Sequence, residues 1–529
     1  MIALYEDHKG NLWVSAQTGV WRWAPGPPEH FRLPGGKVEA TALIEGDSGE
    51  LLIATSITGR ATTTGAIEGL KQLADGKIAS YAPPGFAEHF RPKCLFHSSD
   101  GSLWIGTVQG LLHVYRGRID RFATADGLSG DVVMRIFEDR EGNIWVGTEG
   151  GLDRFRKFTV PTVSRDQGLS NSSVHLVEST PDGSIWIGTA DGLNRSQNGQ
   201  VTVYGRQTDL GERPQRDAQG LSISRSVRDV ANSGLPGTPR SLGKDDWGRL
   251  WASTREGVFY FDRGRFVRVP GVPGGNVFSM VGDGHGKVWI SNDDDGLFSA
   301  TPQGAVDRIP WAQLGQKDGA VSMLPDRLPG GLWLGFFDGG IAYLKDGQVR
   351  ASYNAANGLG KGSVNQLQFA SDGGLWAATD GGLSRIKDGR VATLTSENGL
   401  PCNEVFWAME DDDRSFWLYM PCGLVRIAGP ELNAWMSDSK RSVKTRVFDS
   451  SDGVRTRNSA GRYGPKVTKS PDGKLWFPAM DGISVVDPRH LPFNKLPPPV
   501  YVRQISADGK KYDASPGLRL PAGVRDLSI

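Results

Sequence analysis

The chain has 529 residues, too many for one ordinary hydrophobic core, and its 60 Lys and Arg residues nearly balance its 59 Asp and Glu residues. A net charge of +1 without a basic stripe argues against a nucleic-acid-binding protein, and no apolar run approaches the roughly 20 residues that span a bilayer. Three cysteines without a CxxC motif and eight scattered histidines without an HExxH motif predict neither a disulfide scaffold nor a metal site.

A unit built around one tryptophan recurs along the chain at a spacing of about 41 residues, with insertions in three places. A glycine usually stands three residues before the tryptophan, and a Gly-Leu pair often follows it. The degenerate unit "GELLIAT" carries Leu52 in place of tryptophan. The anchors, in chain order, are Trp13, Trp104, Trp145, Trp186, Trp251, Trp289, Trp333, Trp376, Trp417 and Trp476.

Each unit predicts short antiparallel strands. Around Trp145, "VVMRIFED" and "NIWVGT" are strands joined by a tight glycine-containing hairpin, "LDRF" is a third strand, and "FTVPTVS" at 158–164 supplies a fourth. Four short strands per unit, with no helix signal, predict one blade of a β-propeller. A lone blade cannot bury both of its faces, so we expect the anchor tryptophans to be structural and to fill the wedges between neighbouring blades.

The units resemble a known family, the two-component regulator propeller repeat. The segments "EDREGNIWVGTEGGLDRF" and "TPDGSIWIGTADGLNRS" carry the resemblance, together with the linkers "ADGLSGDVV" and "DQGLSNSSV". Such repeats typically form two seven-bladed propellers in the periplasmic part of a membrane-anchored sensor histidine kinase, followed by an Ig-like domain. The resemblance therefore implies a periplasmic location and a homodimer in the full-length protein.

The resemblance implies an all-β fold of tandem β-propellers with three regions. Residues 1–160 would be the last blades of an incomplete first propeller, 161–492 a seven-bladed second propeller, and 493–529 the start of an Ig-like β-sandwich. The polar stretch 207–237 is either a long loop or a decayed blade. Because no signal peptide follows Met1 and neither a transmembrane helix nor a kinase motif is visible, we expect a piece of a longer protein.

The function implied by the resemblance is ligand sensing, with a carbohydrate or other polar ligand and a signal relayed to a kinase that lies outside the chain. We expect no catalytic residue, cofactor or metal, because no Ser/His/Asp order or nucleophile elbow is visible. Two alternatives stay open. One is a stand-alone propeller that serves as a scaffold for protein interactions, and the other is a propeller enzyme such as a polysaccharide lyase or hydrolase.

Candidate ligand-binding residues come from the loops that lead into the innermost strands, because these loops meet at one mouth of a propeller. Polar groups beside aromatic rings suit a carbohydrate, whereas the alternative is that they only cap loops. We expect aromatic rings outside the anchor positions, such as Trp407 and Trp247, to lie among them. The polar candidates are Asn171, Ser172, Arg240, Asn276, Asp318, Lys361, Asn403, Arg462 and Tyr463.

Two further features stand out between residues 291 and 424. The acidic runs "NDDDG" and "EDDDR" fall at turn positions of the repeat, which predicts solvated turns rather than calcium sites. Cys402 and Cys422 flank one hairpin closely enough to form a disulfide in an oxidising compartment, with two free buried thiols as the alternative. Cys94 has no partner in register.

Overall fold

The computed structural model of the chain is almost entirely β-sheet. It describes residues 3–16, 19–33, 38–46, 48–57, 69–82, 90–115, 118–156, 158–204, 227–230, 233–304, 306–326, 330–459, 461–491, 504–514, 517–521 and 523–528. Most of the predicted loop at 207–237 therefore lies outside the described residues. The chain divides into two compact units, Met1–Lys157 with Phe493–Ile529, and Phe158–Pro492. The predicted all-β propeller class is confirmed, and each unit is described by itself.

Within its described residues, unit 1 contains four consecutive sheets and a small C-terminal one. The first sheet is β1 (Leu4–Glu6), β2 (Leu12–Ala16), β3 (Gly19–Trp23) and β4 (Glu29–Phe31). The second is β5 (Val38–Glu45), β6 (Leu51–Ile57), β7 (Gly69–Ala74) and β8 (Lys77–Tyr81). The third is β9 (Pro92–His97), β10 (Leu103–Thr107), β11 (Gly110–Tyr115) and β12 (Arg118–Phe122). The fourth has β13 (Val133–Glu138), β14 (Ile144–Thr148) and β15 (Leu152–Phe155). The C-terminal sheet is β45 (Gln504–Ala507), β46 (Lys510–Asp513) and β47 (Leu527–Ser528), and its Ig-like character stays a prediction.

Unit 2 contains seven sheets in the described part of the chain. Blade 1 is β17 (Val174–Ser179), β18 (Ile185–Thr189), β19 (Gly192–Gln197), β20 (Gln200–Tyr204) and the parallel β21 (Val227–Val230). Blade 2 is β22 (Ser241–Lys244), β23 (Leu250–Ser253), β24 (Val258–Asp262) and β25 (Arg265–Arg268). Blade 3 is β26 (Val277–Gly282), β27 (Val288–Asn292), β28 (Gly296–Ala300) and β29 (Val306–Ile309). Blade 4 is β30 (Ala320–Pro325), β31 (Gly331–Phe336), β32 (Ile341–Lys345) and β33 (Gln348–Tyr353).

The remaining three blades complete the unit. Blade 5 is β34 (Val364–Phe369), β35 (Leu375–Thr379), β36 (Gly382–Lys387) and β37 (Arg390–Leu394). Blade 6 is β38 (Trp407–Glu410), β39 (Phe416–Met420), β40 (Gly423–Ile427) and β41 (Thr445–Phe448). Blade 7 is β42 (Thr468–Lys469), β43 (Leu475–Ala479), β44 (Gly482–Val486) and β16 (Thr162–Val163). Short 3-10 helices precede several inner strands, namely η1 (Thr124–Asp126), η2 (Arg165–Gln167), η3 (Trp311–Leu314), η4 (Ala355–Asn357), η5 (Ser396–Asn398) and η6 (Ser450–Asp452).

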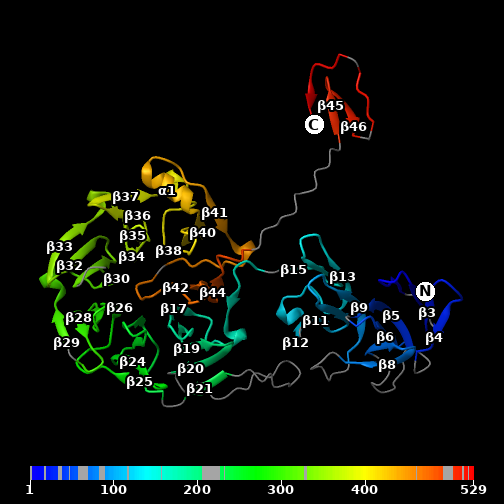
Figure 1. Ribbon diagram of the computed structural model, residues 1–529, viewed down its shortest axis with the longest axis horizontal. Coiled ribbons are helices and arrows are strands. Elements are labelled where there is room, and N and C mark those ends of the chain that lie inside the picture. Colours follow the sequence, from blue (N-terminus) through cyan, green and yellow to red (C-terminus); the bar gives the residue numbers. More distant parts are fainter. Residues whose placement is uncertain are drawn as a thin grey trace. The chain divides into compact units, whose positions relative to one another are not determined.

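The seven sheets of unit 2 form a ring (Figure 1). The innermost strands of neighbouring blades contact one another, from β17 with β22, β22 with β26 and onward to β34 with β38, and β17 also contacts β42 and β43. Blade 7 takes its outer strand, β16, from the beginning of the unit, where it pairs antiparallel with β44. Because this pairing joins the two ends of the unit, every blade has a neighbour on both sides.

Two local predictions were wrong. Residues 158–164 do not supply a fourth strand to the sheet around Trp145; their strand β16 completes blade 7 of unit 2 instead, because closing the ring satisfies an otherwise open edge. Blade 6 also contains an α-helix that no pattern indicated, α1 (Gly429–Ser437). Its residues Leu432 and Trp435 are buried in the core between blades 5 and 6. Among the described residues, no helix is long and apolar enough to cross a membrane.

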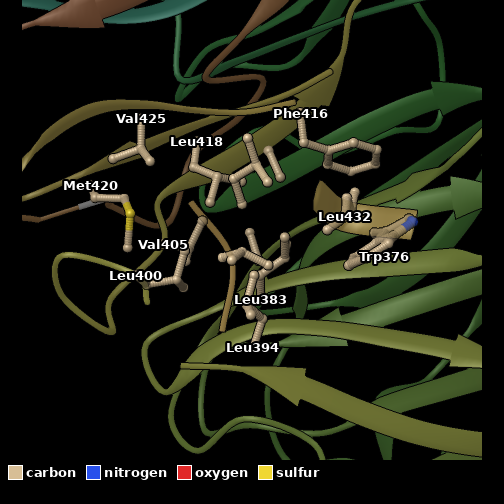
Figure 2. Packing of buried hydrophobic residues seen from close by; sticks show 14 of the residues in the cluster. Trp376, Leu383, Leu394, Leu400, Val405, Phe416, Leu418, Met420, Val425 and Leu432 are labelled. Carbon is tan, nitrogen blue, oxygen red and sulfur yellow. The ribbon is translucent and has the colours of Figure 1, made fainter. Parts of the chain in front are cut away.

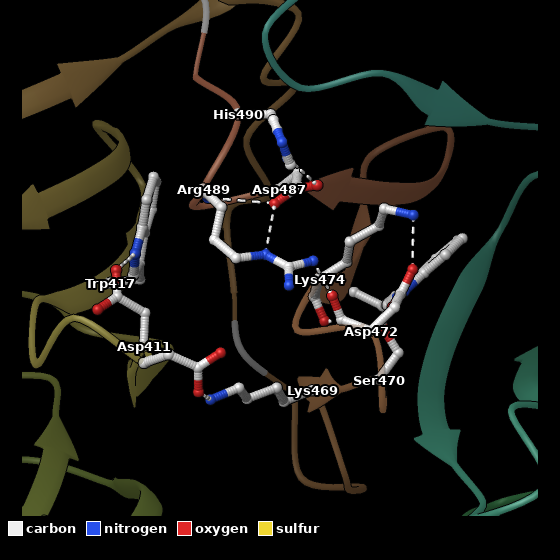
Figure 3. A network of polar contacts seen from close by, with 11 residues as sticks. Asp411, Trp417, Lys469, Ser470, Asp472, Lys474, Asp487, Arg489 and His490 are labelled. Carbon is white, nitrogen blue, oxygen red and sulfur yellow. Dashed lines mark hydrogen bonds and ion pairs between the residues drawn. The ribbon is translucent and has the colours of Figure 1, made fainter.

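The repeat has a common internal geometry around its tryptophan. In six units, the residue six positions before the anchor accepts a hydrogen bond from the indole Nε1, as Asp411 does from Trp417 at 2.8 Å (Figure 3). In five units, the arginine nine positions after the anchor lies directly opposite it on the next strand, with its guanidinium over the indole at 5.3–5.8 Å. The repeat therefore conserves a hydrogen-bond acceptor, an indole and a cation as one packed group.

The core of unit 2 lies between neighbouring blades. Between blades 5 and 6, Trp376 and Phe416 approach with ring centroids 4.9 Å apart and pack with Leu383, Leu394 and Leu418 (Figure 2). Burying an aromatic side chain of this size contributes about 2–3 kcal/mol.

The anchor tryptophans of the two units differ in burial. Six are buried, namely Trp13, Trp104, Trp186, Trp251, Trp376 and Trp417, and four are half-buried, namely Trp145, Trp289, Trp333 and Trp476.

Candidate functional site

One edge of unit 2 gathers the loops that precede the inner strands and the turns that join the second and third strands of each blade. These segments share an edge because neighbouring strands are antiparallel, so that the end of the second strand lies beside the start of the first. Residues 164–173, 310–319 and 395–404 are loops of this kind, and Asp191, Asp294 and Asp380 lie in the corresponding turns. This edge is called the loop face below.

Three of the predicted residues meet on the loop face. Arg240 Nη1 donates to Asn276 Oδ1 at 2.7 Å and to the Tyr463 hydroxyl at 2.8 Å, and that hydroxyl lies 3.2 Å from Asn276 Oδ1. The Arg240 guanidinium also lies over the Tyr463 ring at 5.6 Å. The ring closure thus brings together residues of blades 2, 3 and 7 that lie up to 223 positions apart.

Arg462 and Asp318 lie in a second polar group of this face. The Arg462 guanidinium lies 3.8 Å above the ring centroid of Phe337, in the turn of blade 4. A side-chain hydrogen bond with Asp338, followed by burial, raises the pKa of Asp318, while the charge of Arg462 opposes that increase. Asp318 therefore takes up a proton more readily than an isolated aspartate does.

The remaining polar candidates mainly satisfy the loops that carry them. Asn171 Nδ2 donates to Asp191 Oδ2 at 2.9 Å, and Ser172 Oγ accepts a bond from the Arg165 amide at 3.2 Å. Asn403 Oδ1 accepts a bond from the Ser396 amide at 2.7 Å, and Lys361 is exposed. For Ser172 and Asn403, the loop-capping alternative describes the observed bonds.

Neither predicted aromatic platform lies on the loop face. Trp407 is only 1% exposed, and its ring centroid lies 5.2 Å from that of Phe477 between blades 6 and 7. Trp407 is the first residue of β38, and this strand directs its side chain into the core. Trp247 is 64% exposed, but it lies in the 245–249 hairpin, at the opposite end of β22 from Arg240. Trp407 is therefore buried rather than an open platform, and Trp247 belongs to the other edge.

A cavity of about 800 Å³ opens where the ring closes, and we call it the seam pocket. No sequence pattern indicated it, because its walls come from the start of the unit and from blades 6 and 7. It is lined by Phe158, Thr162, Ser164, Gln167, Pro421, Cys422, Gly423, Asp449, Ser450, Gly453, Val454, Arg455, Thr456, Met480 and Asp481.

The seam pocket combines an ion pair with exposed apolar groups. Arg455 Nη1 lies 2.7 Å from Asp481 Oδ2, whereas the buried Asp481 Oδ1 has no hydrogen-bond partner among the described residues. Phe158 and Met480 remain 54% and 58% exposed. A pocket with an apolar ring and a few converging polar groups suits a small polyhydroxylated molecule, whose hydroxyls bond the charges while its C–H face packs on the ring.

One wall of the seam pocket is tied by a disulfide. The sulfur atoms of Cys402 and Cys422 are bonded, and their Cα atoms lie 6.3 Å apart. The bridge connects the loop before β38 with the turn before β40, so it holds the Cys422 wall against the rest of blade 6. The third cysteine, Cys94, is a buried free thiol whose pKa is raised to about 11, mainly by burial.

The described residues contain no group of three or more His, Cys, Asp or Glu side chains arranged to hold a metal ion. The acidic runs at 293–295 and 411–413 lie in turns between strands. In the second of them, Asp411 accepts amide bonds from Asp413 and Ser415, which is the hydrogen bonding of a tight hairpin.

Seven radially packed sheets closed by a strand from the opposite end of the unit define unit 2 as a β-propeller. Residues 127–150 match the family described as two component regulator propeller, and the resemblance predicted from the sequence is thereby confirmed. No curated protein sequence matches the chain.

One solved structure supports the same fold. The extracellular domain of a putative hybrid two component system from B. thetaiotaomicron has a TM-score of 0.70 at 20% identity, with 99% of this chain and 65% of that chain covered. The extracellular domain of a putative one component system from the same organism has a TM-score of 0.48 at 18% identity, covering 98% and 68%. The chain thus spans about two thirds of the length of these structures, and the first likeness shows a shared fold.

Proposed function

We propose that the chain is the ligand-sensing region of a two-component sensor and that it acts in the periplasm. The matching repeat at 127–150 and the likeness of nearly the whole chain to the extracellular domain of a two component system support this role. The observation that carries the proposal is the seam pocket, a sizeable cavity with an ion pair and exposed apolar groups at the closure of the propeller.

The ligand is a carbohydrate or another polar molecule of similar size. Arg455 and Asp481 offer a donor and an acceptor at one wall, and Phe158 offers an aromatic face near them. Asp481 Oδ1 has no hydrogen-bond partner among the described residues, and an unpartnered buried carboxylate oxygen is costly.

The signal begins in the segment that lines the pocket and closes the ring. Phe158 is the first residue of unit 2, and Thr162 lies in the closing strand, so a ligand in the seam pocket contacts the stretch that connects covalently to unit 1. A ligand shifts a conformational equilibrium only by binding one state more tightly. We infer that the bound state favours one arrangement of this stretch, and that a dimer of the full-length protein passes the change to a kinase.

A panel of oligosaccharides tests the proposal by thermal shift followed by calorimetric titration. A ligand should raise the melting temperature of the wild-type protein, because it binds the folded state alone. Arg455→Ala and Phe158→Ala should each weaken binding by about tenfold, which corresponds to ~1.4 kcal/mol. Trp247→Ala, which removes an exposed ring at the opposite edge, is the matched control and should bind normally. Stabilisation that is equal in all four proteins would contradict the seam pocket, and no stabilisation by any saccharide would contradict the ligand class.

A further inference from the structure

The chain between blades 6 and 7 lies against the inner strands of three other blades. The inner strand of blade 7, β42, has only two residues, and the residues before it do not pair within their own sheet. Instead, Val177 N on β17 donates to Pro465 O at 3.1 Å, Leu242 N on β22 donates to Gly464 O at 3.0 Å, and Gly464 N donates to Phe278 O on β26 at 3.0 Å. Because these are innermost strands, the segment lies on the inner side of the ring.

This segment carries two cations that form no ion pair with the described residues. Arg457 and Lys466 are half-buried, and neither lies within 4.0 Å of a carboxylate in the described part of the chain. Lys466 Nζ donates to the Gly461 carbonyl at 2.7 Å, and Arg457 Nη2 lies 3.4 Å from His175 Nδ1. By contrast, the neighbouring Arg455 is paired with Asp481, and Lys469 with Asp412.

The surroundings make the two charges costly. Burial lowers the pKa of Lys466 to about 8; the charge of Asp380 opposes this decrease, and that of Arg457 adds to it. Burial, followed by the charge of Arg457, also lowers the pKa of His175, so the imidazole is neutral at pH 7 and offers no negative charge. Charges removed from water are normally paired, since an unpaired one loses its hydration without compensation.

The nearby carboxylate is already held by other groups. Asp380 Oδ2 accepts the Ser363 amide at 2.9 Å, and Asp380 Oδ1 accepts Asn365 Nδ2 at 2.9 Å. These bonds fix Asp380 in the turn of blade 5, where it influences Lys466 through its field but forms no ion pair with it. No carboxylate of the described residues therefore neutralises the two cations, which leaves them available to an external anion.

We propose that Arg457 and Lys466 form a binding site for an oxyanion, a carboxylate or sulfate group, on the inner side of the propeller of unit 2. The guanidinium supplies a planar fork of donors for two oxygen atoms, and the ammonium adds a point charge beside it. Arg457 lies two positions after Arg455, and Arg455 and Thr456 both line the seam pocket. The inference rests on the proposed ligand-binding role and narrows the ligand to one with an acidic group.

Titration of the full chain with inorganic sulfate and with acetate, against sodium chloride at matched ionic strength, tests the site. The wild-type protein should bind at least one of them specifically. Arg457→Gln and Lys466→Gln should each weaken binding by about tenfold or more, because each removes a charge-assisted hydrogen bond. Lys466→Arg keeps the charge and should retain most of the affinity. Lys440→Gln, which removes one exposed charge from the loop after α1, controls for net charge and should have no effect.

The outcomes separate this site from the proposed function. Equal anion affinity in the wild type, Arg457→Gln and Lys466→Gln would overturn the site, as would the absence of specific binding in the wild type. Circular dichroism of each variant establishes that it is folded, and Lys466→Arg supplies a second test if Lys466→Gln is not. Saccharide binding in the wild type, together with anion affinity that Arg457→Gln leaves unchanged, would overturn the anion site and leave the sensing proposal intact. Arg457-dependent binding of sulfate without any saccharide binding would support the anion site and contradict the proposed saccharide sensing.

Discussion

Thr162 and Ser484 face each other across the β16–β44 pair, with their hydroxyl oxygens 2.7 Å apart although 322 residues separate them in the chain. This contact is part of the closure of unit 2, in which the first strand of the unit completes its last blade. The seam pocket lies beside the closure and uses Thr162 as part of its wall. Ring closure and the proposed ligand site therefore involve the same short segment.

The closure predicts an effect of Gly482→Ala. A Cβ at position 482 would lie 2.3 Å from the Val163 carbonyl oxygen, so β16 must shift away from β44. We expect a loss of about 1–3 kcal/mol in the free energy of unfolding of unit 2, together with faster amide exchange at residues 158–163. Gly147→Ala is the control, since its Cβ meets nothing nearer than the Arg135 carbonyl at 4.0 Å. Unchanged exchange at 158–163 would show that the segment does not hold the ring.

The repeat geometry predicts different costs for two tryptophans. Trp417 is 0% exposed, and its Nε1 donates to Asp411, so Trp417→Ala should lower the free energy of unfolding by roughly 3–5 kcal/mol. The 64% exposed Trp247 packs mainly on Arg249, and Trp247→Ala should change stability by about 0.5 kcal/mol or less. Chemical denaturation followed by circular dichroism compares the two. Equal losses would contradict the structural role assigned to the anchor.

The Cys402–Cys422 bridge predicts a mass difference on reduction. The protein isolated from an oxidising compartment should gain two alkyl groups at these cysteines only after reduction, as seen by peptide mass spectrometry. The bridge closes a loop of 20 residues, so its loss should cost roughly 3 kcal/mol through greater freedom of the unfolded chain. The double variant Cys402→Ser with Cys422→Ser measures that cost, and Cys94→Ser is the control for a buried thiol. Alkylation of both cysteines without reductant would refute the bridge.

The oxyanion site predicts a pH dependence with a defined sign. Because the pKa of Lys466 is about 8 in the folded protein, the ammonium loses its charge above that value and anion affinity should fall as the pH rises through 8. The pKa of His175 is lowered, so its ring stays neutral across this range. Lys466→Arg stays charged and should abolish the decrease. A wild-type affinity that stays constant from pH 7 to about pH 9 would contradict a role for Lys466.

The lowered pKa of Lys466 also affects the stability of the folded protein, which should rise with pH while the anion affinity falls. An unfolded lysine has a pKa of about 10.4, so between about pH 8 and pH 10.4 the unfolded chain binds more protons than the folded one. Lys466 therefore destabilises the folded state below about pH 8, and this penalty is relieved as the pH rises. Thermal melting of Lys466→Met against the wild type checks the sign: the variant should gain stability at pH 7 and lose that advantage near pH 10.

The sequence by itself determined the blades. A strand, a tight hairpin and a second strand form from contiguous residues, so the tryptophan and glycine offsets around Trp145 or Trp417 are enough to place them. The arginine nine positions after the anchor belongs to the same local register, and it lies over the indole for that reason. The likeness to the two component regulator propeller follows from these local patterns.

Only the tertiary structure decided where the ring closes and what its closure creates. The strand β16 follows β15 in sequence but pairs with β44, Trp407 points into the core, and Arg457 and Lys466 lie on the inner side of the ring without a carboxylate partner among the described residues. These outcomes depend on contacts across up to 322 positions, and a period of about 41 residues carries no information about such contacts. The blades form from contiguous residues and were predictable, whereas the seam pocket and the proposed oxyanion site form only when the ring of blades closes.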